Sequence, residues 1–261
     1  MHTGTLPSKT LRETALYLTG FQHRQLYRTL PAEFDMNAHS VADLMCRLPD
    51  VWSQQTTQIN KNLERHGVEV ILGSGEFEDA HHFRVAGRCL ESDFFLISTG
   101  SSPRVPEAFD FGDPEVYDSD SILKLENIPE TLAIIGGGVI GSEYACVFAA
   151  LGVKIEVIEA RPRILSFLDF EISDRLKAAM ERGGIHFYLD NGVESLVREG
   201  DKLVLALQSG DKMHVDKVLI SAGRTGNSSG FGLDRIGVEI DKRKNIVVDG
   251  EFRTNVSHVF A

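Results

Sequence analysis

The chain has 261 residues, of which 42% are hydrophobic, enough to bury one large core or two modest ones. Its formal net charge of -11 disfavours nucleic acid and anionic membranes as partners, because the summed field repels polyanions. No apolar run of about eighteen residues and no signal-peptide leader are visible, which predicts a cytoplasmic protein. The nine histidines are scattered without metal-ligand spacing, so no metal site is expected.

The cysteine content indicates a reducing compartment. Cys46, Cys89 and Cys146 lie far apart and form no C-x-x-C pattern. We therefore expect three free thiols that are buried or inert.

The first part of the chain is expected to combine helices with a small sheet. One helix is expected from Ser8 to about Leu18, and a longer one over residues 40–66, ended by Gly67. Pro49 should kink or divide the longer helix. Three β-like runs follow, at Val68–Leu72, His82–Val85 and Phe94–Ser98. A proline-containing polar segment then predicts a domain boundary near Asp113–Ser121.

A glycine-rich turn in the middle of the chain has the pattern of a dinucleotide site. An apolar strand, Leu132–Ile135, runs into the sequence Gly136-Gly137-Gly138-Val139-Ile140-Gly141 and then into a helix. Gly136 permits the tight turn, Gly138 lets the backbone approach a pyrophosphate, and Gly141 lets the helix pack close to the strand. The helix begins at Val139 and Ile140, and its free N–H groups would face the phosphates.

The next strand, Lys154–Ile158, ends at an acidic residue followed by two arginines. Glu159 lies about twenty residues beyond the turn, where a carboxylate can bind the adenosine ribose hydroxyls of NAD. Arg161 and Arg163 could instead attract the 2′-phosphate of NADP. A loop with both features suits a site that accepts both dinucleotides, and two solvated arginines after a strand are the alternative.

The remainder predicts a nucleotide-binding domain of the α/β class. A helix is expected over Phe170–Arg182, a strand over Ile185–Leu189, a hairpin of Lys202–Leu207 with Lys212–Val215, and a buried strand over Lys217–Ser221. A parallel sheet combined with an antiparallel meander is typical of a Rossmann-like domain.

Three short motifs in the expected order resemble one family, the flavin disulfide reductase-like enzymes that bind FAD and a nicotinamide dinucleotide. The motifs are Thr5-Leu6-Pro7-Ser8-Lys9, Thr99-Gly100-Ser101-Ser102-Pro103 and Ser221-Ala222-Gly223-Arg224. The resemblance implies FAD, NAD and NADP as cofactors. It places Gly4, Thr5, Gly75, Thr99 and Gly100 on the FAD side, and Val193 and Gly223 on the nicotinamide dinucleotide side.

One departure from the family pattern selects a branch. The dithiol members carry a C-x4-C pair whose second cysteine falls where this chain has Thr5, and a dithiol relay needs that sulfur. Four segments of the chain instead resemble the soluble, Si-specific NAD(P)+ transhydrogenases, which pass hydride between NADPH and NAD+ through FAD: His2–Glu13, Tyr117–Leu123, Phe167–Glu171 and Gly223–Asn227. The alternatives are a dihydrolipoamide dehydrogenase-like oxidoreductase relative and a nucleotide-binding module without turnover.

The same resemblance suggests two catalytic residues. Lys9 would lie near the flavin N5 edge and pair with Glu143, which would favour a reduced anionic flavin. A surface lysine and an ordinary exposed glutamate are the alternative.

The resemblance also implies a domain plan. Residues 1–115 would form part of an FAD-binding α/β domain, residues 116–245 a Rossmann-like NAD(P) domain inserted in it, and residues 246–261 a return strand. The chain is expected to be an internal fragment of a homo-oligomeric parent enzyme, and to be monomeric and inactive by itself.

Overall fold

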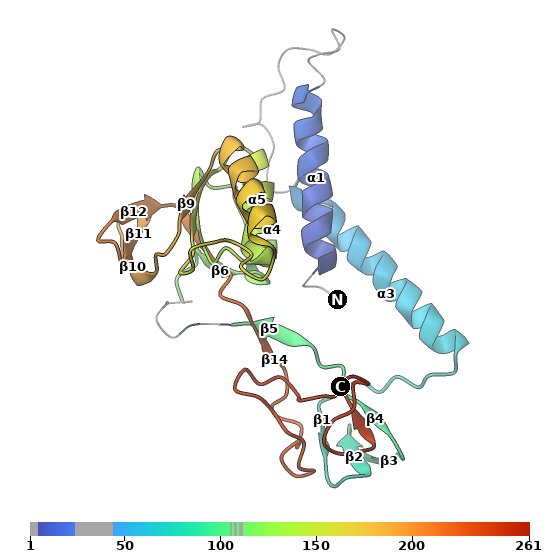
Figure 1. The fold of residues 1–261 in the computed structure, drawn as a ribbon. Coiled ribbons are helices and arrows are strands. Elements are labelled where there is room, and N and C mark those ends of the chain that lie inside the picture. The colour runs from blue at the N-terminus through green and yellow to red at the C-terminus, as the bar shows by residue number, and fades with distance from the viewer. Residues whose placement is uncertain (1–4, 24–43, 105, 107–108, 110–111) are drawn as a thin grey trace. The chain divides into compact units, whose positions relative to one another are not determined.

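The computed structural model describes residues 5–23, 44–104, 106, 109 and 112–261 (Figure 1). The chain divides into two compact units. The first unit comprises residues 1–57 and 105–223, and the second comprises residues 58–104 and 224–261. The division expected from the sequence, at residues 115 and 245, stays a prediction.

A five-stranded parallel sheet forms the centre of the first unit. Its strands, in spatial order, are β6 (Val116–Asp118), β13 (Lys217–Ile220), β7 (Thr131–Ile135), β8 (Lys154–Ile158) and β9 (Ile185–Tyr188). From β7 the chain moves outward through β8 to β9, and β13 is later added on the other side of β7. The strand order therefore reverses between β7 and β13, and ligands of such sheets bind at this reversal, outside the carboxyl ends of the strands.

The two faces of this sheet are covered by different elements, as the side-chain alternation of a strand requires. Leu132 and Ile134 point into a core shared with the helices, whereas Ala133, between them, belongs to the core beneath a β-meander. The sequence prediction of a parallel sheet with a meander in an α/β fold is confirmed.

Helices α1 (Thr5–His23), α4 (Val139–Ala150) and α5 (Phe170–Arg182) contribute to the first of these cores (Figure 1). Helix α5 has the predicted bounds, because Asp169 accepts a hydrogen bond from the Glu171 N–H at its start and Gly183 caps its end. Leu11 and Ala15 of α1 are fully buried in the same core.

The helix expected over residues 40–66 is observed from residue 44, because residues 40–43 lie outside the described part. It is interrupted at Cys46, and α3 spans Arg47–Arg65. Pro49 has no N–H to donate to the residue 45 carbonyl, so the predicted division of this helix is confirmed.

The meander consists of β10 (Val193–Glu199), β11 (Lys202–Leu207) and β12 (Lys212–Val215), joined as antiparallel neighbours. The predicted hairpin of β11 and β12 is confirmed. The sequence pattern does not predict β10, because only Val193, Leu196 and Val197 interrupt its polar sequence with apolar side chains and most of the strand is exposed.

The second unit contains short strands around an aromatic core. Strands β1 (Gly75–Phe77), β2 (His82–Val85) and β3 (Arg88–Glu91) form an antiparallel sheet, β4 (Phe95–Leu96) pairs with β15 (Val259–Phe260), and β5 (Ser101–Pro103) pairs with β14 (Arg224–Gly226). The ring of Phe77 meets the rings of Phe83 and Phe95 edge-on, with centroids 5.0 and 4.9 Å away.

The prediction of a strand at Val68–Leu72 is wrong. These residues form no strand, and within the described part of the chain no β-ladder pairs with them. The side chains of Val68, Val70 and Leu72 are 49%, 56% and 87% exposed. Alternating apolar residues form a strand only when another strand or a core surface receives them, so the pattern is insufficient here.

The cysteines are free thiols, as expected, but all three are exposed rather than buried. The Cys89 thiol donates to a Glu78 carboxylate oxygen at 3.2 Å, and this hydrogen bond raises its pKa. Although Cys146 is exposed on its surface side, partial desolvation by its neighbours raises the pKa of its thiol. Both shifts disfavour the reactive thiolate.

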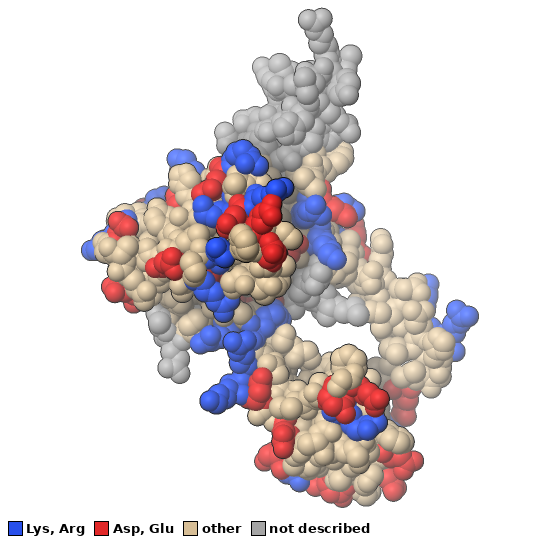
Figure 2. Space-filling model, in the orientation of Figure 1, with Lys and Arg blue, Asp and Glu red and all other residues tan. Residues whose placement is uncertain are grey.

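Figure 2 shows how the charge is distributed over one face of the molecule. Acidic side chains lie among the basic ones on both units. None of the described helices is long and apolar enough to span a bilayer.

Candidate dinucleotide site

The glycine-rich turn follows β7 at the point where the strand order reverses. Gly136 has φ of +111°, and a Cβ there would lie 2.6 Å from the Ser221 carbonyl oxygen. A Cβ on Gly141 would lie only 1.9 Å from the Gly136 carbonyl oxygen. Both contacts are with backbone atoms, which cannot rotate away. The first and last glycines of the motif are therefore required by the turn and by the packing of α4 on it.

Gly138 differs from these two, because the space beside it is open. It is the N-cap of α4, in an extended conformation, and a Cβ would meet no atom within 4 Å. The N-terminus of α4, at Val139 and Ile140, begins directly after it. An open approach to a helix N-terminus is the geometry that binds a pyrophosphate through backbone N–H groups.

Glu159 lies directly after β8 and bonds to the same turn. One of its carboxylate oxygens accepts from the Gly137 N–H at 2.7 Å, and the other accepts from the Arg161 N–H at 3.0 Å. The structure therefore brings the predicted acid to the glycine turn, where it also organises the backbone.

The two arginines after β8 have different surroundings. The Arg161 Nη1 donates to the Ser166 hydroxyl at 2.7 Å. The Arg163 Nε lies 3.6 Å from a carboxylate oxygen of Asp174 in α5, and its guanidinium lies over the Phe170 ring, 5.4 Å from the centroid.

Ser221 also holds the glycine turn in place, although from the sequence it is recognisable only as part of a family motif. Its hydroxyl lies 3.0 Å from the carbonyl oxygens of both Ile135 and Gly136, and its N–H donates to the Ile135 carbonyl. It therefore fixes the turn to the end of β13. The pattern of a serine directly after a buried strand, opposite a glycine turn, was the available signal.

Two further predicted residues lie on the first unit. Gly223 follows Ser221 with φ of +100° and open space where a Cβ would be. Val193, at the start of β10, is half-buried and packs against the core beneath the meander. Val193 thus contributes to the core, and its predicted place beside the dinucleotide stays a prediction.

Thr99 and Gly100, which the family resemblance predicts to contact FAD, line a cavity of about 430 Å³ on the second unit. Asn227 fixes this segment: its side-chain amide donates to the Thr99 carbonyl at 3.0 Å, and its N–H donates to the Gly100 carbonyl at 3.0 Å. The cavity and the open space beside Gly100, at φ of +71°, fit part of an extended cofactor such as FAD. Gly75 does not line this cavity, and a Cβ there would lie 2.3 Å from the Phe83 ring, so packing accounts for this glycine.

Glu143 contacts α1, the helix that carries its predicted partner Lys9. The Ser8 hydroxyl donates to a Glu143 carboxylate oxygen at 3.2 Å, which joins α1 to α4. Lys9 is exposed, and within the described residues no ion pair joins it to Glu143. Thr5 begins α1, and Gly4 lies outside the described residues.

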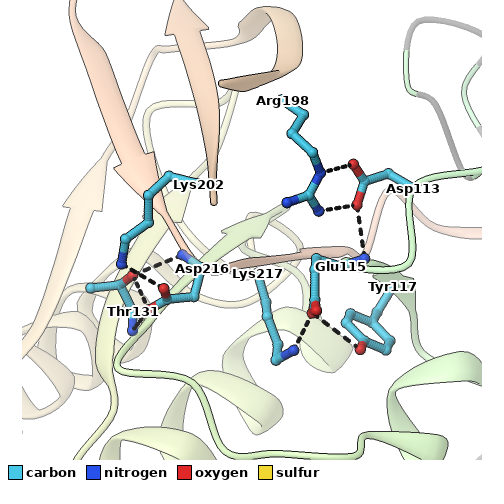
Figure 3. A network of polar contacts seen from close by, with 8 residues as sticks. All are labelled: Asp113, Glu115, Tyr117, Thr131, Arg198, Lys202, Asp216 and Lys217. Carbon is cyan, nitrogen blue, oxygen red and sulfur yellow. Dashed lines mark hydrogen bonds and ion pairs between the residues drawn. The ribbon is translucent and has the colours of Figure 1, made fainter. Parts of the chain in front are cut away.

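A polar network lies at the opposite, amino edge of the sheet (Figure 3). The Arg198 guanidinium binds Asp113 through two hydrogen bonds of 2.7 and 2.6 Å, and the Lys202 ammonium binds Asp216 at 2.5 Å. The ammonium of Lys217, whose side chain is 4% exposed, pairs with Glu115. These contacts connect the meander, the strand ends and the segment before β6.

The network shifts several pKa values. The hydrogen bond from Arg198 lowers the pKa of Asp113. Burial raises the pKa of Asp216, but hydrogen bonds from Lys202 and Thr131 outweigh it, so that the net shift is downward. Burial and the Glu115 carboxylate raise the pKa of Tyr117 to about 12.

Comparison with known families decides the assignment of the fold. The family model described as pyridine nucleotide-disulphide oxidoreductase matches residues 1–261. The chain belongs to this family. Its curated relatives include the soluble pyridine nucleotide transhydrogenases of Mycobacterium bovis (strain BCG / Pasteur 1173P2), 36% identical, and of Photobacterium profundum, 38% identical. Both matches cover 100% of this chain, which spans 57% and 56% of the two relatives.

Two solved structures have the same fold as this chain. The HOCl-induced flavoprotein disulfide reductase RclA from Escherichia coli matches with a TM-score of 0.83 and 27% identity, over 100% of this chain and 56% of that one. LpdA from Mycobacterium tuberculosis matches with a TM-score of 0.88 and 24% identity, over 99% of this chain and 57% of that one. The chain thus spans about half the length of the relatives and solved structures that it matches.

Proposed function

We propose that this chain carries the nicotinamide dinucleotide site and part of the FAD site of a pyridine nucleotide transhydrogenase. Such an enzyme is an oxidoreductase that moves hydride between NADPH and NAD+. The observation that supports this most is the Gly136–Gly141 turn, placed between β7 and β13 and bonded to Glu159. The names of the relatives point to the same activity.

The hydride chemistry in this proposal is supplied by the flavin and the nicotinamide, and the protein supplies position and electrostatics. The N-terminus of α4 would hold the pyrophosphate and Glu159 the adenosine ribose. Thr99, Gly100 and the cavity beside them would hold part of FAD. Lys9 and Glu143 remain the proposed catalytic residues, with Ser8 orienting the Glu143 carboxylate. A cytoplasmic location is part of the same proposal.

A calorimetric titration of the full 261-residue chain with NADH, and separately with NADPH, tests the nucleotide site. We expect saturable binding of both, with dissociation constants within about tenfold, or about 1.4 kcal/mol. Gly138→Ser is the matched variant, because it adds a side chain where the pyrophosphate would lie and keeps a good N-cap. Equal binding by this variant would contradict the assignment of the turn.

A further inference from the structure

Residues 190–192, which follow β9, connect the loop after β8 to the hairpin of β11 and β12. On the loop side, the Asn191 N–H donates to the Glu159 carbonyl at 3.1 Å. The Asp190 N–H donates to the Arg161 carbonyl, also at 3.1 Å. The backbone that carries the Glu159 carboxylate is therefore fixed by the turn after β9.

On the hairpin side, the Asn191 side chain makes two hydrogen bonds to one residue of the hairpin tip. Its amide oxygen accepts from the Ser209 N–H at 3.2 Å, and its amide nitrogen donates to the Ser209 hydroxyl at 2.9 Å. The Ser209 hydroxyl in turn donates to an Asp211 carboxylate oxygen at 2.8 Å. The Gln208 N–H donates to the Gly192 carbonyl at 2.9 Å. The hairpin tip is therefore joined to the turn after β9 by backbone and side-chain bonds.

Asn191 is the buried member of this contact. It is 7% exposed, and both polar groups of its side chain are used in the bonds to Ser209. Burying an amide is costly unless its donor and acceptor are paired, so the position of Asn191 depends on the hairpin tip. Ser209 and Asp211 are exposed. Asn191 is thus held by the hairpin through its side chain and holds Glu159 through its backbone.

The orientation of the Glu159 carboxylate matters because two N–H groups already occupy part of it. Its oxygens accept from Gly137 and from Arg161, and a carboxylate offers about four lone-pair sites, so about two remain for ribose hydroxyls. Hydrogen bonds weaken steeply with distance and angle, and a binding group must be held to within about 0.5 Å of its working position. A movement of the Glu159 backbone would therefore misdirect the remaining sites.

We propose that Asn191 is a positioning residue of the dinucleotide site. Anchored by Ser209, it holds the Glu159 backbone so that the carboxylate meets the hydroxyls of the adenosine ribose. The meander then contributes to binding as well as to the core, since its hairpin tip supports the acid of the site. The inference rests on the proposed function, because it names the residue that orients Glu159 in that site.

The test measures how strongly the full chain distinguishes NADH from the NADH analogue that lacks the 2′-hydroxyl of the adenosine ribose. The quantity is the ratio of the two dissociation constants in calorimetric titrations. We expect a ratio of about tenfold for the unmodified chain, the loss typical of one hydrogen bond to a charged group, and a ratio near one for Glu159→Gln. Asn191→Ala should lower the ratio to about threefold or less by weakening NADH, and should change the affinity for the analogue by less than about twofold.

Further variants separate positioning from a general loss of stability. Ser209→Ala changes an exposed position, so it keeps the fold even if Asn191→Ala does not, and it should lower the ratio by a smaller factor. Thr131→Val is the matched control, because it breaks the hydrogen bonds of Thr131 with Asp216 at the amino edge of the sheet (Figure 3). It should lower the Tm and leave the ratio unchanged. In the Glu159→Gln background, Asn191→Ala should change the ratio no further.

The outcomes distinguish this inference from the proposed function. An unchanged ratio in Asn191→Ala, or in Ser209→Ala where Asn191→Ala does not fold, would overturn the assignment to Asn191. An equal loss of affinity for NADH and for the analogue would do the same. A ratio near one for the unmodified chain would overturn the inference and leave nucleotide binding at the glycine turn standing. Binding of neither compound would overturn the proposed function itself and the inference with it.

Discussion

Replacing Gly141 by alanine should destabilise the first unit and weaken dinucleotide binding. The new Cβ would lie 1.9 Å from the Gly136 carbonyl oxygen and 2.6 Å from the Ser221 hydroxyl oxygen, so the turn or α4 must move. Overpacking of this kind costs about 1–3 kcal/mol, and the better helix propensity of alanine returns up to about 1 kcal/mol. We expect a net loss of about 2 kcal/mol, or about 4–8 °C in Tm for a unit of this size.

The measurement is thermal unfolding by circular dichroism, together with NADH affinity by calorimetry. Gly138→Ser is the control, because its Cβ meets no atom within 4 Å and serine is a favourable N-cap. It should keep the wild-type Tm and lose affinity, whereas Gly141→Ala should lose both. A Gly141→Ala variant with an unchanged Tm and an unchanged affinity would refute the argument from close approach.

Three further changes test the remaining contacts. Lys217→Met should lower the unfolding free energy by about 1–2 kcal/mol, as measured by urea titration. The loss should be smaller than for a fully buried pair, because the Glu115 side chain is 30% exposed. Adding Glu115→Gln should restore part of the lost unfolding free energy, because it removes the unpaired charge. Asp113 and Asp216 have lowered pKa values, so their stabilisation is present above about pH 4 and is lost as the pH falls through their folded pKa values. As the pH is lowered from 6 to 3, the Tm of Asp216→Asn should fall less steeply than the Tm of the unmodified chain. Identical slopes for the two proteins would contradict this. Ser221→Ala should weaken NADH and NADPH binding by a similar factor, since it loosens the turn beneath both, and a change confined to one dinucleotide would count against that role.

The parts of the fold that the sequence predicts well are those with strong local signals. Strand β8 and helix α5 match their predicted bounds, because a buried apolar run and an Asp169 cap with a following Gly183-Gly184 stop define them locally. Val68–Leu72 has an equally strong alternation and forms no strand, because strand formation also depends on a distant partner.

The candidate site, too, could be predicted from the sequence only where local signals define it. The glycine turn and Glu159 could be placed from spacing alone, since one βαβ unit positions both. The different surroundings of Arg161 and Arg163 could not be predicted from spacing, because they depend on Ser166 and on Asp174 of a later helix. The hydrogen bond of Ser8 to Glu143 joins residues far apart in the chain, which no local pattern reports.

The pairing of β4 with β15 affects how the chain folds during synthesis. Phe95 leaves the ribosome before the whole first-unit sheet has been made, and its partner Val259 is among the last residues described. At typical elongation rates of about 5–20 residues per second, the aromatic strand waits on the order of ten seconds for its partner. The first-unit sheet can assemble during this interval, so the second unit is expected to close last and to be the part that chaperones encounter unfinished.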